Sequence, residues 1–155
     1  MNNYHLYFGR AGQLFVMSEF LLRSWNVAIP EVDEGDDIFV VKHETGRLMR
    51  IQVKAAQSKT QKEGFYAQFN ISVKQLSDIT KGYHFVFVVR HHNHWEQILI
   101  IRQNDLFDMF EAQNLGSIHK DNLILRLTFK NGKVTNKAID LTEYQNNFED
   151  FIIEI

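Results

Sequence analysis

The sequence predicts one α/β domain over residues 1–155, in which helices flank a central mixed sheet. Two observations favour this fold class. The chain has 155 residues, of which 45% are hydrophobic and 13 are Phe, which is enough to fill one core. Hydrophobic residues also recur with two periods, every three to four residues in some segments and every second residue in others, and these periods are typical of helices and strands.

The N-terminal part of the chain predicts a helix followed by strands. Leu14, Met17 and Leu21 recur at helical spacing and predict the first helix. A tight turn through Thr45-Gly46 joins two runs that are rich in β-branched residues, and this indicates a hairpin. The predicted elements are, in order, a helix over residues 11–24 and strands over residues 27–29, 37–43 and 48–55.

The remaining sequence predicts further helices and strands after a polar stretch, residues 57–64, that we expect to be a mobile loop. Ser72 and Gln75, and again Thr142 and Gln145, have the spacing of a capping box, which is typical of helix N-termini. The predicted elements are an extended segment at 65–71, a helix ending at Gly82, strands at 84–90 and 95–102, a helix at 105–112, a hairpin of strands at 123–130 and 133–138, and a final helix opened by Thr142.

The composition excludes several classes of protein. The chain has no Cys, which excludes disulfides and thiolate metal sites and fits a cytoplasmic location. Its longest apolar runs, such as residues 85–89, are too short to span a membrane, and no signal peptide is expected. The formal net charge is −2, yet residues 42–81 hold eight Lys or Arg against three Asp or Glu. A basic segment inside an acidic chain is compatible with a phosphate-binding face and equally with a solvated, charge-mixed surface.

The hairpin over residues 37–55 brings three polar residues to one face. If its turn is symmetric about Thr45-Gly46, Asp37 lies directly opposite Lys54. Since side chains alternate between faces, Asp37, Gln52 and Lys54 then share one face. The apolar residues of the hairpin collect on the other face, which we expect to be buried; they are Ile38, Val40, Ile51 and Val53.

A carboxylate, an amide and an ammonium group in this arrangement suit phosphodiester hydrolysis. Asp37 can hold a divalent cation such as Mg²⁺, which prefers oxygen ligands, and Gln52 can add a neutral oxygen. Lys54 can orient the attacking water and offset the charge that develops on the phosphoryl group. The alternative is an ordinary exposed ion pair between Asp37 and Lys54, with no role for Gln52.

The order of these motifs resembles the PD-(D/E)XK nuclease superfamily. The residues that resemble it are Gly9-Arg10-Ala11-Gly12, the loop from Asp33 to Asp37, and Ile51-Gln-Val-Lys54. They are similar to small bacterial domains related to Holliday-junction resolvases, here as a variant with Gln-x-Lys. The resemblance implies a restriction-endonuclease-like core of order αβββαβ, to which this chain adds a C-terminal β-hairpin and helix.

The resemblance also implies roles for individual residues. Asp37 matches the metal-binding aspartate and Lys54 the catalytic lysine, whereas Gln52 stands where Asp or Glu is usual. Glu19 is the acidic residue of the first helix and is expected to be catalytic and to bind the metal, although a related pattern would place that glutamate at Gln13. The implied cofactor is Mg²⁺ or Mn²⁺, held by Asp37, Gln52, Glu19 and the backbone carbonyl of Val53.

The expected macromolecular partner is DNA, and a homodimer is compatible with the sequence. Lys59 and Lys62 are expected to contact DNA phosphates from the loop beside the site. The tract from His91 to His94 could bind a metal, but adjacent strand residues point to opposite sides, so a solvated hairpin tip is favoured.

Three functions remain open on the sequence. The first is a divalent-metal-dependent endonuclease that hydrolyses DNA phosphodiester bonds. The second is a catalytically impaired relative that binds nucleic acid without cleavage, which the amide at Gln52 and the negative net charge favour. The third is a protein-interaction module that uses an aromatic-rich surface.

Overall fold

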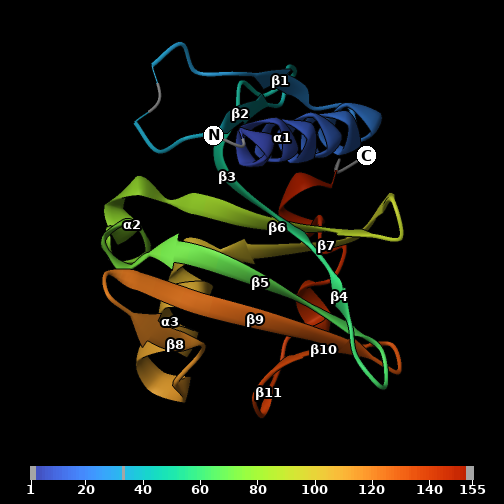
Figure 1. Ribbon diagram of the computed structural model, residues 1–155. Helices are drawn as coiled ribbons and strands as arrows, with labels where there is room; N and C mark the ends of the chain where they lie inside the picture. The colour runs from blue at the N-terminus through green and yellow to red at the C-terminus, as the bar shows by residue number, and fades with distance from the viewer. Residues whose placement is uncertain (1–2, 33, 153–155) are drawn as a thin grey trace.

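The computed structural model describes residues 3–32 and 34–152 and contains two β-sheets with a long helix packed on the first (Figure 1). The first sheet is mixed, and its strands lie in the order β1 (Asn26–Ala28), β2 (Ile38–Val41), β3 (Leu48–Gln57), β6 (Tyr83–His91) and β7 (His94–Arg102). β3 and β6 are parallel, and the other neighbours are antiparallel. The structure therefore confirms the predicted mixed α/β architecture.

The second sheet is antiparallel and was not expected from the sequence. Its strands lie in the order β11 (Ile139–Asp140), β10 (Lys133–Asn136), β9 (Asn122–Lys130), β5 (Phe65–Ser72) and β4 (Lys59–Thr60), and β8 (Ser117–His119) also pairs with β9. The predicted C-terminal hairpin is present as β9 and β10. It pairs with β5 and so becomes part of a separate layer.

Two hydrophobic cores cover the two faces of the first sheet. On one face, α1 (Tyr4–Leu22) buries Val16 and Phe20 against β2, β3 and β6. On the other face, the second sheet and α3 (Gln103–Gln113) pack against Phe85 and Phe87 of β6. One face is thus covered by a helix, and the other is covered by a second sheet together with a helix.

The close contact of α1 with the first sheet depends on Gly12. A Cβ atom at this position would lie 2.7 Å from the Cβ of Ala55, so only glycine allows the helix this close to β3. The glycine explains part of the Gly-x-x-Gly pattern at the start of the chain through packing.

The β2–β3 hairpin has a different register from the expected one. Ile38 pairs with Ile51 and Val41 with Leu48, so Asp37 lies beside Gln52 rather than opposite Lys54. The turn is longer than a two-residue turn, since the Gly46 N–H donates to the Lys42 carbonyl at 2.8 Å and Gly46 has a φ of +67°. The register shifts by two residues, and this even shift leaves every side chain on its predicted face.

Three local predictions were wrong. The stretch 57–64 contains β4, which pairs with β5, and is not a simple loop. The segment opened by Thr142 forms a single 3₁₀ turn, η2 (Thr142–Tyr144), followed by η3 (Glu149–Phe151), so no C-terminal α-helix forms in the described residues up to 152. Its capping box also fails, because the Thr142 hydroxyl and backbone N–H both bond to Asp140 instead.

In the described part of the chain, none of the helices is both long enough and apolar enough to cross a membrane.

Candidate active site

Asp37 stands directly before β2 and receives two hydrogen bonds on one carboxylate oxygen. Its Oδ2 accepts the side-chain Nε2–H of Gln52 and the backbone N–H of Val53, each at 2.8 Å. The Asp37 N–H donates to the Ile51 carbonyl at 3.1 Å, which extends the hairpin by one residue. The carboxylate is therefore fixed against the middle of β3.

Gln52 and Lys54 lie on the face of β3 that turns toward the second sheet. Val53, between them, belongs to the core under α1, and strand side chains alternate between faces. Gln52 is buried, with 7% of its surface exposed. The structure thus brings together Asp37, Gln52 and Lys54, as the alternation predicted.

The environment of Lys54 makes its ammonium group less stable than in water. Burial lowers the pKa of Lys54 below its ordinary value, and the nearby Asp37 carboxylate opposes that shift. A desolvated lysine beside a carboxylate is typical of sites in which a lysine assists proton transfer or stabilises charge.

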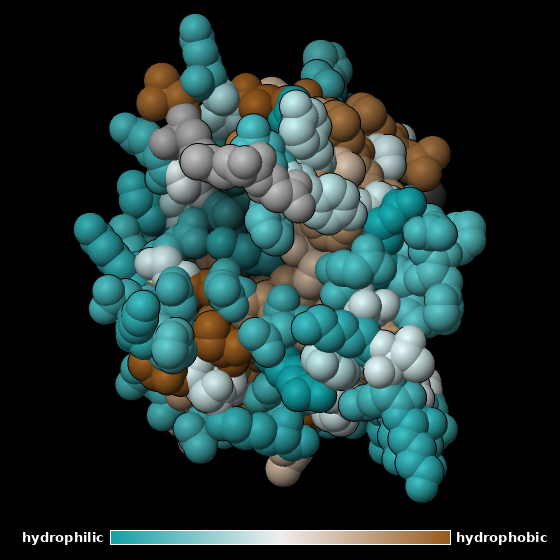
Figure 2. Space-filling view, in the orientation of Figure 1, coloured by the Kyte–Doolittle hydropathy of each residue, from teal (hydrophilic) through white to brown (hydrophobic). Residues whose placement is uncertain are grey.

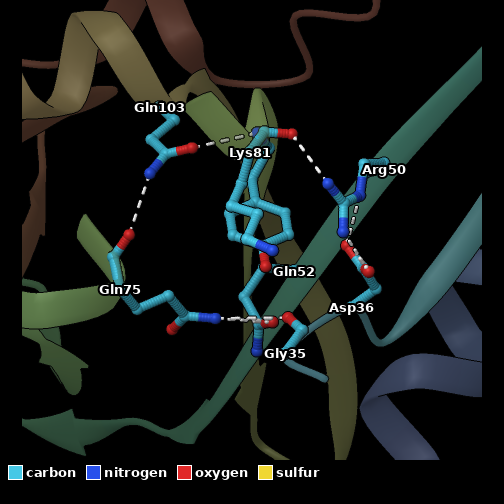
Figure 3. Close-up of polar contacts among 8 residues, drawn as sticks. Gly35, Asp36, Arg50, Gln52, Gln75, Lys81 and Gln103 are labelled. Atoms are coloured by element: carbon cyan, nitrogen blue, oxygen red, sulfur yellow. Dashed lines mark hydrogen bonds and ion pairs between the residues drawn. The ribbon is translucent and has the colours of Figure 1, made fainter. Parts of the chain in front are cut away.

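Gln75 holds Gln52 in its orientation (Figure 3). Its Nε2–H group donates to the Gln52 Oε1 at 3.0 Å and to the Gly35 carbonyl at 3.2 Å. The Gln52 amide therefore presents its nitrogen to Asp37 and its oxygen to Gln75. Gln75 lies in α2 (Val73–Ser77) and links this helix to the loop before β2.

The expected capping box at α2 is only half formed, because the Gln75 side chain is bonded to other residues. The Ser72 hydroxyl accepts the backbone N–H of Gln75 at 3.3 Å, as predicted. The Gln75 side chain is used for Gln52 and Gly35.

Gln103 anchors α2 from the beginning of α3. Its buried side-chain Nε2 donates to the carbonyls of Gln75, Leu76 and Asp78, at 2.8 to 3.1 Å. Its Oε1 accepts the Tyr83 N–H at 3.1 Å, so one amide connects α2, α3 and β6. Figure 3 shows Gln103 bonded to the backbone of Gln75, so Gln103 holds in place the helix that carries Gln75.

Asp36 and Arg50 fix the loop before Asp37. The Arg50 guanidinium donates from Nε to Asp36 Oδ1 at 2.8 Å and from Nη2 to Oδ2 at 2.5 Å, which is a bidentate pair. Arg50 also donates to the Lys81 carbonyl at 3.2 Å. Asp36 is buried, and its hydrogen bond raises the pKa of Arg50. Of the two adjacent acids, Asp36 thus holds the loop in place through Arg50, and Asp37 points to Gln52.

A pocket of about 270 Å³ opens beside this network. It shares Gly35 and Gln75 with the network, and its charged lining residues are two lysines, Lys74 and Lys81, and two acids, Glu34 and Asp78. Figure 2 shows a hydrophilic hollow on the face where β5 and β9 lie toward the viewer in Figure 1. The two lysines are cations that sequence reasoning did not assign to the site.

Glu19 is not brought to this group of residues. Its Oε2 accepts the Arg23 Nη1–H at 2.9 Å within α1. α1 packs on the face of the first sheet opposite to the side chains of Gln52 and Lys54. Gln13, the alternative position, accepts a hydrogen bond from Arg10 at 3.0 Å.

Lys59 and Lys62 lie away from Asp37, contrary to the expectation that they flank the site. Lys59 belongs to β4, and Lys62 lies in the turn between β4 and β5. At about 3.3 Å per strand residue, Lys59 is roughly 16 Å along the chain path from Lys54. The β4–β5 turn lies at the opposite end of β5 from α2 (Figure 1).

The donor set around Asp37 fits a hydrated magnesium ion that has few protein ligands. The N–H and C=O of one strand residue point to the same edge, so the Val53 carbonyl faces the side of Asp37. Mg²⁺ is usually held by one or two carboxylates, waters and substrate phosphates. Within residues 3–32 and 34–152, no three His, Asp or Glu side chains are grouped as a metal cage. The residues fit a weak site of one carboxylate and one backbone carbonyl, with the Gln52 oxygen turned toward Gln75.

The comparisons with known proteins concern the fold. The structure is similar to that of a bacterial homing endonuclease, I-Ssp6803I, with a TM-score of 0.55 and 17% sequence identity. The match covers 98% of this chain and 93% of that chain. The chain has a nuclease-like fold. No protein-family model matches the sequence, and no curated protein matches it.

Sequence reasoning missed the residues that support the site. Gln75, Gln103 and the Asp36–Arg50 pair come from four separate elements, and their spacing in the sequence has no regular pattern. The one sequence signal is Gln75 itself, a glutamine at the N3 position of a capped helix, but its spacing from Ser72 predicts a cap rather than a contact with Gln52.

Proposed function

We propose that this protein is a divalent-metal-dependent nuclease that hydrolyses DNA phosphodiester bonds with a metal ion bound at Asp37. The observation that supports it most is the convergence of Asp37, Gln52 and Lys54 in a nuclease-like fold. Asp37 and the Val53 carbonyl would hold Mg²⁺ or Mn²⁺, and Gln52 would join them by turning its amide, because its nitrogen faces Asp37 and its oxygen accepts from Gln75. When bound, the ion would polarise the phosphoryl oxygen and lower the pKa of a bound water.

The protein's own residues have separate tasks in this proposal. Val53 and Gln52 hold the Asp37 carboxylate in place through its Oδ2. Lys54 positions the attacking water, and its lowered pKa reduces the cost of transferring a proton. Lys74 and Lys81, which line the adjacent pocket together with Glu34 and Asp78, neutralise phosphates that flank the scissile bond. Glu19 is left out of the set because it is bound to Arg23.

The outer face of the second sheet is proposed as the DNA-binding surface. On this face Tyr66, Gln68 and Asn70 of β5 lie opposite Thr128, Arg126 and Ile124 of β9. The Arg126 guanidinium lies 3.6 Å from the centre of the Tyr66 ring. β4, β5, β9 and β10 contain no Asp or Glu.

Amide and guanidinium groups on a β-ribbon suit contacts with base edges in the major groove. Lys59 and Lys62 extend this face at its far end and would contact phosphates distant from the cut. The cations of this face would make binding depend on salt concentration.

The second candidate function is DNA binding without cleavage. It is favoured by the Gln52 Nε2–H group, which donates to Asp37 and so takes a position that an acidic residue would use for a metal. Both functions predict salt-sensitive DNA binding, and they differ only in whether a bond is cut.

A plasmid-nicking assay tests the proposal. The wild-type protein should convert supercoiled DNA to the nicked form with Mg²⁺ or Mn²⁺ and not with EDTA. Lys54→Ala should reduce the rate by at least about 100-fold. The matched control is Arg10→Ala, which removes an exposed cation of α1, on the face of the first sheet opposite to Lys54, and should leave the rate unchanged. Metal-independent nicking, or nicking that survives Lys54→Ala, would refute the proposal, and binding without any nicking would establish the second candidate.

A further inference from the structure

A separate pocket, of about 370 Å³, lies between the first turns of α1 and the second sheet. Tyr4 and Phe8 of α1 and Tyr66 of β5 line it with aromatic rings, whereas β3 contributes the small side chains of Ala55 and Ala56. β3 passes here from the layer of α1 to the second sheet, where it continues into β4 (Figure 1). The pocket thus combines aromatic rings from two layers with a strand whose side chains leave room.

The other residues that line this pocket are polar. They are His5, Gln57, Lys59 and Gln68. Within the described chain, none of the lining residues is acidic, and Lys59 supplies a formal positive charge. Aromatic rings, amide groups and a cation together suit a planar heteroaromatic group that is joined to a phosphate.

The aromatic side chains of the pocket are held in place by neighbouring residues. The centre of the Phe8 ring lies 5.3 Å from that of Trp95 and 5.8 Å from that of Tyr4. The Arg126 guanidinium lies 3.6 Å from the centre of the Tyr66 ring. A pocket that is already ordered loses less side-chain entropy when a ligand binds.

The pocket borders the same edge of β3 as the proposed catalytic residues. β2 pairs with Leu48–Ile51, and among the described residues no strand pairs with this edge of β3 beyond Ile51. The Val53 N–H points to the open edge and donates to Asp37. Since backbone groups alternate between the two edges of a strand, those of Ala55 point to the open edge as well. At about 3.3 Å per residue, the pocket begins about 7 Å along this edge from Val53.

We propose that this pocket takes one unstacked nucleobase of the strand that is cut, so that the preferred substrate is DNA with an unpaired nucleotide near the scissile bond. This inference rests on the proposed nuclease function, because Asp37 and Val53 place the scissile phosphate. One strand of B-DNA advances about 3.4 Å of helix axis per nucleotide, so a base about 7 Å from Val53 belongs to a nucleotide one or two positions from the cut.

Stacking and pairing explain why an unpaired base is selected. Tyr4 and Tyr66 contact the faces of the base, and the amides of Gln57 and Gln68 bond to its polar edge. A paired base must first leave the duplex, which costs stacking and pairing energy, whereas an unpaired base has no partner to lose. The duplex on either side stays on the outer face of the second sheet, to which Tyr66 and Gln68 also belong.

Fluorescence anisotropy in EDTA tests the pocket without cleavage. The probes are two labelled duplexes of one sequence, one fully paired and one with a single bulged nucleotide. The wild-type protein should bind the bulged duplex at least about 10-fold more tightly, because a base stacked on an aromatic ring adds affinity. Tyr66→Ala should remove this preference, and Tyr66→Phe, which keeps the ring, should retain it.

Two further variants keep this test informative. Tyr4→Ala changes the opposite side of the pocket at a residue that is 56% exposed, and it should also remove the preference. Tyr7→Ala is the matched control, because it removes a tyrosine of α1 that is 75% exposed and does not line the pocket, so the preference should remain. Melting temperatures equal to that of the wild type would show that the variants fold.

Photocrosslinking locates the base directly. When the bulged nucleotide is 5-iododeoxyuridine, irradiation should attach the DNA to Tyr4, Phe8 or Tyr66, as identified by mass spectrometry. A crosslink outside the pocket would overturn the proposal. Displacement of the bulged duplex by an equimolar free deoxynucleoside monophosphate would assign the pocket to a free nucleotide and would also overturn it.

The binding and nicking assays separate the failure of this inference from the failure of the nuclease proposal. Equal affinity for the two duplexes, or a preference that survives both Tyr4→Ala and Tyr66→Ala, would overturn the inference. Equal rates of nicking on the two duplexes with Mg²⁺ would overturn it and leave the nuclease function intact. A preference for the bulged duplex without any nicking would support the pocket and refute the nuclease function.

Discussion

Replacing Gln52 with glutamate should make the stability of the fold depend on a bound divalent metal ion. In the wild type, the neutral Gln52 amide donates a hydrogen bond of 2.8 Å to the Asp37 carboxylate. Gln52→Glu removes this donor and places a second carboxylate in the same buried position. Without a cation, two negative charges would face each other across that contact.

The expected cost follows from the distance and the burial. Two unit charges about 4 Å apart repel by about 4 kcal/mol at an effective dielectric constant of 20. Protonating one glutamate at pH 7 instead costs about 3.7 kcal/mol, which limits the penalty. We therefore expect Gln52→Glu to lower the free energy of unfolding by about 2–4 kcal/mol at pH 7 without metal.

This penalty should depend on pH and on metal. The pKa of the paired carboxyl is raised in the folded state, so the folded protein binds more protons than the unfolded one and the loss shrinks as the pH falls toward 5. A divalent ion that binds only the folded state restores about 2.7 kcal/mol when its concentration is 100 times its dissociation constant.

Urea unfolding with and without Mn²⁺ measures both effects. The matched control is the double variant Asp37→Asn with Gln52→Glu, which restores a neutral partner for the carboxylate and should lose both the penalty and the response to Mn²⁺. If Gln52→Glu unfolds at the wild-type urea concentration in EDTA and Mn²⁺ adds no stability, Asp37 and Gln52 do not form the proposed metal site.

Four further predictions follow from individual contacts. Lys54→Met should abolish nicking without loss of thermal stability, because it removes a charge whose pKa is lowered by burial; a lower melting temperature would contradict this. Gln75→Ala should slow nicking by about 10-fold at unchanged DNA affinity, since it frees the Gln52 amide, and an unchanged rate would argue against this positioning role. Asp150→Asn should lower the free energy of unfolding by about 2 kcal/mol at neutral pH, because hydrogen bonding from Arg102 above all lowers the pKa of Asp150 to about 2. The stability that the Asp150 carboxylate contributes is complete above its ordinary pKa of 3.8 and is lost as the pH falls through about 2. The unfolding curves of the variant and the wild type should therefore converge over that interval. Gly12→Val should cost about 1–3 kcal/mol in urea unfolding, because its Cβ would lie 2.7 Å from that of Ala55, and wild-type stability would show that α1 can move away.

The sequence was sufficient to predict which face of the hairpin each side chain occupies, and it was insufficient to predict the register. Alternation depends only on the parity of residue numbers, so Asp37, Gln52 and Lys54 were placed on one face correctly. The register depends on how many residues the turn absorbs, and Gly46 allowed a longer turn than the Thr45-Gly46 pattern suggested. The prediction that the three residues share a face remained correct because the register differed by an even number of residues.

The second sheet and the supporting glutamines could not be predicted, because they depend on long-range contacts. β5 pairs with β9 across 50 to 64 residues, and local periodicity gives no information about such partners. The same limit applies to Gln75, whose contacts with Gln52 and Gly35 lie 23 and 40 residues away along the chain. Glu19 shows the opposite case, since a local partner, Arg23, decided its orientation.

A crystal structure of the protein with Mn²⁺ and a short DNA duplex, recorded with anomalous scattering, tests the central claim most directly. We predict an anomalous peak in contact with the Asp37 carboxylate and the Val53 carbonyl, with a DNA phosphate beside Lys54. An ion bound elsewhere, with Gln52 still donating its hydrogen bond to Asp37 while DNA occupies the site, would contradict the proposed chemistry.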